Sequence, residues 1–201
     1  MTDSQPGSGP AIEEFDQARS EQYRFLARLL AAPPSAEMLQ QIAQLQGDDS
    51  PLGHAFANLA RAAAGADAKA VEREFFELFI GVGRGELLPY ASFYQTGFLN
   101  ERPLADLRGD LATLGVARAE GRHEPEDHIA LLFEVMADFA AGEIVADEKT
   151  QAQFHARHVQ PWAVQFFDDL AVAPSVAFYR PVAEIGRILT EIETRAFALA
   201  A

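Results

Sequence analysis

The sequence has 201 residues, of which 49% are hydrophobic, and this suffices for one globular domain with a core or for two small ones. It contains no cysteine, which excludes disulfides, iron–sulfur clusters, thiolate zinc sites and cysteine nucleophiles. A formal net charge of −14 disfavours nucleic acid and anionic membrane surfaces as partners, whereas a cationic partner would be attracted.

The chain begins with the polar stretch "MTDSQPGSGP", which lacks the basic start and the apolar centre of a signal peptide. We expect residues 1–10 to form a disordered tail and residues 11–201 to form one helical domain. No stretch approaches the ~18 uninterrupted apolar residues of a membrane span. We therefore expect a cytoplasmic protein without membrane insertion.

Apolar residues then recur at steps of three and four, which is the period of a helix buried along one face. The first helix is expected to end before Pro33 and Pro34. Its predicted buried stripe consists of Phe15, Ala18, Gln22, Phe25, Leu26, Leu29 and Leu30.

Three further helices are predicted up to residue 80. Ser35, Ser50 and Asp67 precede them and are expected to be their N-caps, and Pro51 suits a first helical position. The predicted buried face of the third consists of Val71, Phe75, Leu78 and Phe79. It is expected to end at the glycines Gly81, Gly83 and Gly85.

The longest irregular segment, "GVGRGELLPYASFYQTGFLNERP", covers residues 81–103. Its glycines do not form a phosphate loop, because no strand precedes them and no Lys-Ser/Thr follows. A helix is predicted next, with Leu104, Leu107, Leu111 and Leu114 on one side and Gly115 at its end.

In the remainder of the chain, apolar residues also recur with the period of a helix. Residues 124–139 form one segment and residues 147–171 another, with Pro161 in the middle of the latter, where the helix kinks or a new one starts. A last helix follows Pro174. Without any strand alternation, the fold class is all-α, a single-domain bundle of about eight to ten helices.

Charged residues open the segment "EPEDHIALLFEVMADF". If Glu124 is the N-cap, Pro125 takes the first helical position, and Glu126 and Asp127 fall in the first turn, where the helix dipole favours negative charge. His128 begins the apolar stripe and is predicted to face inward. A helix cap with a buried histidine is one interpretation of this cluster.

A metal site is the alternative interpretation. Asp127 and His128, together with His155 and His158, could supply carboxylate and imidazole ligands of a helical metal-binding enzyme. The repeated Glu-x-x-His pairs of di-iron bundles are absent from the sequence. A helical adaptor protein unrelated to redox enzymes is a third possibility.

Four stretches resemble one known family. "EPEDH" fits the Glu-Pro-x-Asp-His signature of the TorD/DmsD/NarJ family of cytoplasmic molybdoenzyme maturation chaperones, also called redox enzyme maturation proteins, and "YRFLARLLAAPP" resembles its first helix. A second family segment is matched by Phe79, Gly81, Pro89, Ser92 and Tyr94. A third is matched by Phe154, His158, Pro161 and Trp162. The resemblance covers about residues 20–190, and Val82 departs from it, because many members have proline there.

The resemblance implies an all-helical chaperone without intrinsic catalysis or a resident cofactor. Transient binding of the molybdenum cofactor or of a nucleotide is left open. The implied partners are the apo catalytic subunit of a molybdenum or tungsten oxidoreductase and, in many members, its twin-arginine leader peptide. Residues 81–99 favour a formate-dehydrogenase-like client, and both a monomer and a homodimer are compatible with the family.

A twin-arginine leader is an arginine pair followed by an apolar run, and its complement is an acidic patch beside an apolar groove. The carboxylates of Glu124, Glu126 and Asp127 are expected to bind the arginines. Tyr90, Tyr94 and Trp162 are expected to line the groove, unless Tyr94 and Trp162 are core residues. The predicted docking residues are Glu124, Pro125, Glu126, Asp127, His128, Tyr90, Ser92, Tyr94, His158 and Trp162.

Overall fold

The computed structural model describes residues 10–117 and 124–200, so residues 1–9 of the predicted tail lie outside the described residues. Within residues 10–117 and 124–200, the chain is helical and contains no strand, which confirms the predicted all-α class. The first helices are α1 (Pro10–Ala31), α2 (Ala36–Ile42), α3 (Pro51–Ala64), α4 (Ala68–Phe75) and α5 (Ala91–Thr96). The others are α6 (Arg102–Thr113), α7 (Ile129–Ala140), α8 (Glu148–Phe154), α9 (Ala163–Val172) and α10 (Tyr179–Ala200). Short π-helical turns, η1 (Phe76–Ile80) and η2 (His155–Val159), continue α4 and α8.

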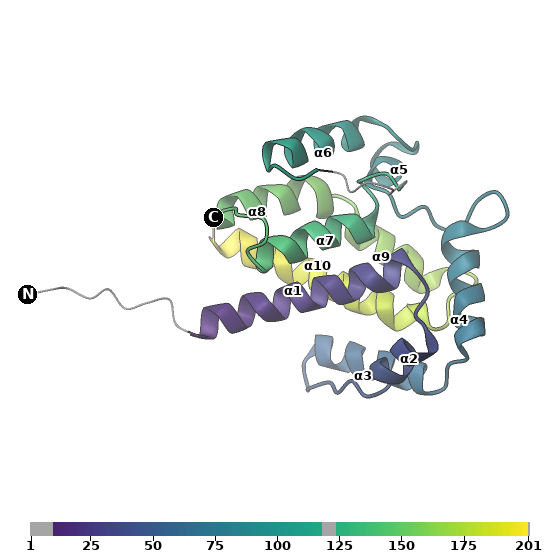
Figure 1. Ribbon diagram of the computed structural model, residues 1–201. Helices are drawn as coiled ribbons and strands as arrows, with labels where there is room; N and C mark the ends of the chain where they lie inside the picture. Colours follow the sequence, from purple (N-terminus) through teal and green to yellow (C-terminus); the bar gives the residue numbers. More distant parts are fainter. Residues whose placement is uncertain (1–9, 118–123, 201) are drawn as a thin grey trace, which may run out of the picture.

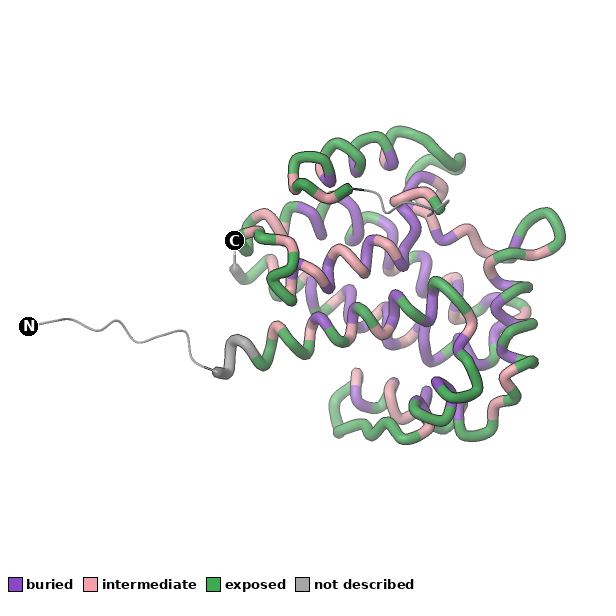
Figure 2. The backbone as a smooth tube through the Cα atoms, viewed as in Figure 1, coloured by how far each residue is buried: buried purple, intermediate pink, exposed green. Residues whose placement is uncertain are grey.

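Helices α1, α7, α9 and α10 form the centre of the bundle. Helix α1 packs along α7, and α10 packs against α9 and α3. Figure 1 shows α6 and α5 on one side of α7, with α2 and α3 on the opposite side of the molecule. The buried segments in Figure 2 follow the inner faces of these central helices. Within the described residues, no helix is long and apolar enough to cross a membrane.

The buried stripe of α1 differs from the predicted one at its beginning. Phe15 is 58% exposed and Ala18 is also exposed, so these two positions of the predicted stripe are wrong. The side chain that faces the interior there is Arg19, which donates to the buried carboxylate of Glu193 at 2.8 and 3.0 Å. A buried carboxylate such as that of Glu193 requires a cationic partner. Arg19 therefore faces the interior at this point, in place of the apolar side chain that the helical period predicts.

Local signals place most helix ends correctly. The side chains of Ser35, Ser50 and Asp67 accept from backbone N–H groups of the first turns of α2, α3 and α4, as predicted. Helix α5 was not predicted, because it lies inside the glycine- and aromatic-rich segment. At Pro161 the chain starts a new helix instead of kinking, since η2 ends at Val159 and α9 begins at Ala163.

The N-terminus of α10 is capped from a distance. The carboxylate of Glu74, in α4, is 8% exposed and accepts from the backbone N–H groups of Ala177, Phe178 and Tyr179 at 2.8–2.9 Å. The initial N–H groups of a helix have no partner within the helix. Glu74 therefore supplies the acceptor that joins α4 to the start of α10.

We expect Glu74→Ala to lower the free energy of unfolding by about 3 kcal/mol or more, because three N–H groups, of which those of Phe178 and Tyr179 are buried, lose their acceptor. Urea unfolding at neutral pH measures this change. Glu72→Ala, on the exposed face of the same helix, is the matched control and should change stability little. Equal stability of the two variants would contradict the assignment of Glu74 as the cap of α10.

Candidate functional site

Helix α7 begins later than its sequence suggests. Its first residue is Ile129 and its N-cap is His128, whose Nδ1 accepts from the N–H of Ala130 at 3.1 Å. The prediction of Glu124 as the N-cap and Pro125 at the first helical position is therefore wrong. Residues 124–127 precede the helix and form a turn.

A short antiparallel pairing explains this late start. The N–H of Ala91 donates to the carbonyl of Asp127 at 3.0 Å, and the N–H of Ile129 donates to the carbonyl of Pro89 at 2.9 Å. His128 consequently has an extended backbone, with φ −66° and ψ 136°. Pairing with the segment before α5 thus overrides the local helix signals.

Asp127 is completely buried and acts on α5. Its Oδ2 accepts from the N–H of Ser92 at 2.8 Å, in the first turn of α5, and Ser92 is itself fully buried. A carboxylate at a helix N-terminus satisfies a free N–H and complements the helix dipole. Asp127 therefore fastens α5 to the start of α7, and its burial keeps it from direct contact with a client.

Tyr90, His128 and Glu124 form a cluster next to this pairing. The Tyr90 ring meets the His128 ring edge to face at 5.1 Å between centroids, and its hydroxyl donates to a carboxylate oxygen of Glu124. Burial, followed by the Glu124 carboxylate, raises the pKa of Tyr90. Burial lowers the pKa of His128 to about 4, against the opposing charge of Glu124, so its ring is neutral near pH 7.

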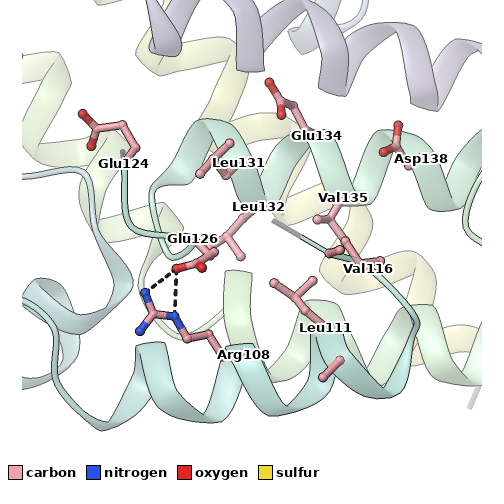
Figure 3. A pocket seen from close by; sticks show the side chains of 12 residues that line it. Arg108, Leu111, Val116, Glu124, Glu126, Leu131, Leu132, Glu134, Val135 and Asp138 are labelled. Atoms are coloured by element: carbon pink, nitrogen blue, oxygen red, sulfur yellow. Dashed lines mark hydrogen bonds and ion pairs between the residues drawn. The ribbon is translucent and has the colours of Figure 1, made fainter. Parts of the chain in front are cut away.

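Glu126 points to the other side of the turn, toward α6. Arg108 donates to its Oε2 from Nε at 2.9 Å and from Nη2 at 2.7 Å (Figure 3). This hydrogen bond raises the pKa of Arg108. The Arg108 side chain is 50% exposed, and ion pairs of this kind typically contribute about 0–1 kcal/mol to stability.

Two adjoining cavities run along the outer face of α7, and together we call them the α7 groove. The first has a volume of about 400 Å³ and lies between α6 and α7. Its lining residues are Arg108, Leu111, Ala112, Val116, Ala117, Glu124, Glu126, Leu131, Leu132, Glu134, Val135 and Asp138. The second, of about 310 Å³, is lined by Leu30, Ala31, Phe75, Phe79, Ile80, Pro89, Tyr90, Glu124, His128, Ala130, Leu131 and Glu134. The two cavities share Glu124, Leu131 and Glu134, so they lie next to each other along α7.

The α7 groove combines an apolar floor with an acidic rim. Figure 3 shows Leu131, Leu132 and Val135 between the carboxylates of the first cavity, to which Asp138 also belongs. Among the described residues that line the groove, Arg108 is the only Lys or Arg. Such a surface complements a peptide that carries cationic and apolar side chains.

The predicted docking residues Tyr94, His158 and Trp162 line neither cavity. Trp162 is 2% exposed, donates from Nε1 to the carbonyl of His158 at 2.7 Å, and lies 5.4 Å from the Tyr94 ring. His158 is paired with Asp110 of α6 at 2.7 Å, and burial lowers its pKa against the effect of that carboxylate. The structure corrects their placement: Trp162 and Tyr94 belong to the aromatic packing of the core, and His158 joins η2 to α6.

Leu131, Glu134, Val135 and Asp138 of the groove were not predicted as docking residues. They occupy positions i, i+3, i+4 and i+7 along α7 and so lie on one side of the helix, which is the signal that could have identified them. That signal was obscured because the buried face of α7 is even more apolar. Arg108 carried no signal, since its partner Glu126 is 18 residues away.

The alternative metal site is not assembled. In residues 10–117 and 124–200, no group of three or more histidines and acidic residues has a geometry that could hold a metal ion. His155 is 1% exposed, packs against Phe197, and borders a different cavity, of about 720 Å³, between α8, η2 and α10. Burial, with a smaller effect of Arg19, lowers the pKa of His155 to about 4.

Comparisons with known proteins agree with the sequence resemblance. Residues 45–168 match the family model described as nitrate reductase delta subunit. The chain is 25% identical over 194 residues to the chaperone protein TorD of Aliivibrio fischeri. This alignment covers 85% of the chain and 90% of the relative. The chain is also 25% identical over 211 residues to the TorD of Vibrio atlanticus, covering 92% and 96%. The match to the TorD of Vibrio cholerae, at 27% identity, spans about half of each chain, 56% and 55%.

A solved structure shows the same fold. It is described as a redox enzyme maturation protein from Archaeoglobus fulgidus and superimposes with a TM-score of 0.56 over 86% of this chain and 93% of the other. The sequence identity in that comparison is 18%, so the similarity concerns the fold alone.

The buried neutral histidines make stability depend on pH. Since both His128 and His155 have a folded pKa of about 4, below the ordinary value near 6.5, the unfolded chain binds protons first as the pH falls. We expect the free energy of unfolding to decrease between pH 6.5 and 4, by up to about 3 kcal/mol for each imidazole. Urea unfolding across this range should show a shallower decrease for His155→Phe than for the wild type.

His54→Gln is the control for this experiment, because His54 is exposed. Its pH dependence should be parallel to that of the wild type. Parallel curves for His155→Phe as well would show that the imidazole of His155 is not kept neutral by burial.

Proposed function

The chain belongs to the nitrate reductase delta subunit family, to which the TorD and NarJ chaperones belong, and we propose that its client is the apo catalytic subunit of a molybdenum or tungsten oxidoreductase. The relatives are named as chaperones, which confirms the prediction of a chaperone rather than an enzyme. In this proposal the protein acts in the cytoplasm. It keeps the subunit competent for cofactor insertion before assembly or export.

The observation that carries the proposal is the α7 groove. Its apolar floor lies between carboxylates that come from the turn before α7 and from α7 itself. An extended or helical segment with cationic side chains beside an apolar run matches this arrangement. A twin-arginine leader peptide has that composition, and we include it in the proposal as the segment bound.

The two cavities differ in a way that suits the two parts of such a leader. The lining of the second cavity includes Phe75, Phe79, Pro89 and Ile80, and the last of these is 54% exposed. Apolar client side chains fit there. The first cavity adds the carboxylates of Glu126 and Asp138, which accept from Arg108 and Arg24 in this structure. Because these carboxylates pair with guanidinium groups of the chain, the cavity suits the arginines of a client.

The motif residues divide between two tasks in this proposal. Glu124 and Glu126 border the groove and contribute charge to its rim. Asp127 is buried and holds α5, and His128 caps α7, so both act by positioning the turn that carries the two glutamates. A formate-dehydrogenase-like client is compatible with the segment around Val82, which is 98% exposed at the tip of the loop after η1.

Co-purification from the native host tests the proposal. The tagged wild type should retain a molybdoenzyme catalytic subunit, identified by quantitative mass spectrometry. Glu134→Arg places a cation in the middle of the α7 groove and should reduce the retained subunit about tenfold or more, because like charges then face each other.

Glu148→Arg is the matched control, since it changes the net charge equally on exposed α8, outside the groove. Circular dichroism must show that both variants are folded. Equal retention by all three proteins would overturn the groove as the docking site. Absence of any molybdoenzyme subunit from the wild type would overturn the proposed function itself.

A further inference from the structure

Two carboxylates of the α7 groove already hold a guanidinium from the chain itself, since Asp138 accepts from Arg24 of α1 and Glu126 accepts from Arg108, the arginine that borders the groove. Arg108 reaches from α6 across the first cavity and donates twice to Glu126, whose side chain is only 15% exposed (Figure 3). The Arg108 side chain is 50% exposed and borders the same cavity. It thus occupies the kind of place that an arginine of a client would take.

We propose that Arg108 is an internal competitor that holds Glu126 until a client arginine replaces it, and that it thereby sets the selectivity of the groove for cationic segments. This inference rests on the proposed function, because it requires a client segment in the groove. It goes further in assigning a residue that the family motifs do not include.

The geometry of the pair favours exchange. Both donors of Arg108 reach the same oxygen, Oε2 of Glu126, whereas the strongest arginine–carboxylate pairs use two parallel hydrogen bonds to two oxygens. Because Arg108 is half exposed, its guanidinium can turn into water when it is displaced, and no buried charge is left behind. The incoming guanidinium has the same chemistry, so Glu126 keeps a cationic partner throughout.

Competition of this kind discriminates between client segments. A purely apolar segment cannot replace Arg108, so the arginine stays paired with Glu126 at the first cavity, which Leu111 and Val116 also line. A segment with an arginine releases Arg108 and gains Glu126 as a partner. Removing Arg108 should therefore strengthen the binding of arginine-containing segments only.

Direct binding measurements test this inference. The probes are a synthetic peptide with an arginine pair before an apolar run and the same peptide with a glutamine pair. We expect Arg108→Gln to bind the arginine peptide about two- to fivefold more tightly than the control Arg102→Gln, which is the range that exposed ion pairs cover. Arg102 lies on the same helix and is 87% exposed, so the control removes the same charge at a distance from the groove.

The glutamine peptide should bind both variants equally. Adding Glu126→Gln to Arg108→Gln should abolish the increase in affinity for the arginine peptide. A merely structural role of Arg108 would not predict this loss. Equal or weaker binding of the arginine peptide by Arg108→Gln, relative to Arg102→Gln, would overturn the inference.

The same measurements separate this inference from the proposed function. If the wild type binds the arginine peptide better than the glutamine peptide but Arg108→Gln shows no gain, only the competitor role fails. If the wild type binds neither peptide, or binds both equally, the leader-binding proposal fails and the inference fails with it.

Discussion

The α7 groove depends on one short pairing of backbone segments, residues 89–91 with residues 127–129. Its two hydrogen bonds, at 2.9 and 3.0 Å, keep His128 extended and make α7 start at Ile129. The buried Asp127 carboxylate adds a third connection, to the N–H of Ser92. The pairing leaves residues 124–127 as a turn before the helix, and Glu124 and Glu126 border the first cavity from this turn. A backbone contact thus creates the site, and the side chains of the site only complete it.

Buried and exposed charges have different tasks in this molecule. Glu74, Asp127 and Glu193 are almost inaccessible, and each accepts hydrogen bonds from a helix N-terminus or, in the case of Glu193, from the partly buried Arg19. Removing a partner from such a group leaves a desolvated charge, so these contacts connect the helices strongly. The carboxylates of the groove rim lie nearer to water, where pairing contributes little to stability. Removal of a partner at the rim is therefore expected to disturb the fold little.

The sequence predicts those features that depend on a few neighbouring residues. Ser35, Ser50 and Asp67 cap the helices that follow them because a hydroxyl or carboxylate reaches the N–H two or three residues on. Local signals also predict a helix start at Glu124. Residues 89–91, however, form hydrogen bonds with the backbone of residues 127–129, and no local sequence pattern predicts a partner about 37 residues earlier. Phe15 was misplaced for a related reason, since the charge of distant Glu193 selects Arg19 for the interior. The acidic character of the site was predictable from composition and motif, whereas its floor depends on how α6, α7 and η1 meet.

The proposed docking of a client segment in the α7 groove requires both capture and later release, and the charges and cavities of the groove bear on each step. The net charge of −14 and the acidic rim raise the rate of encounter with a cationic segment, because long-range attraction acts before contact. Exposed ion pairs then add little to the lifetime of the complex, which depends mainly on the apolar surface buried. That surface is confined to two small cavities of about 400 and 310 Å³, so the groove can hold only a short apolar run. For the proposed docking site, this division between the charged rim and the apolar floor predicts fast capture with moderate affinity.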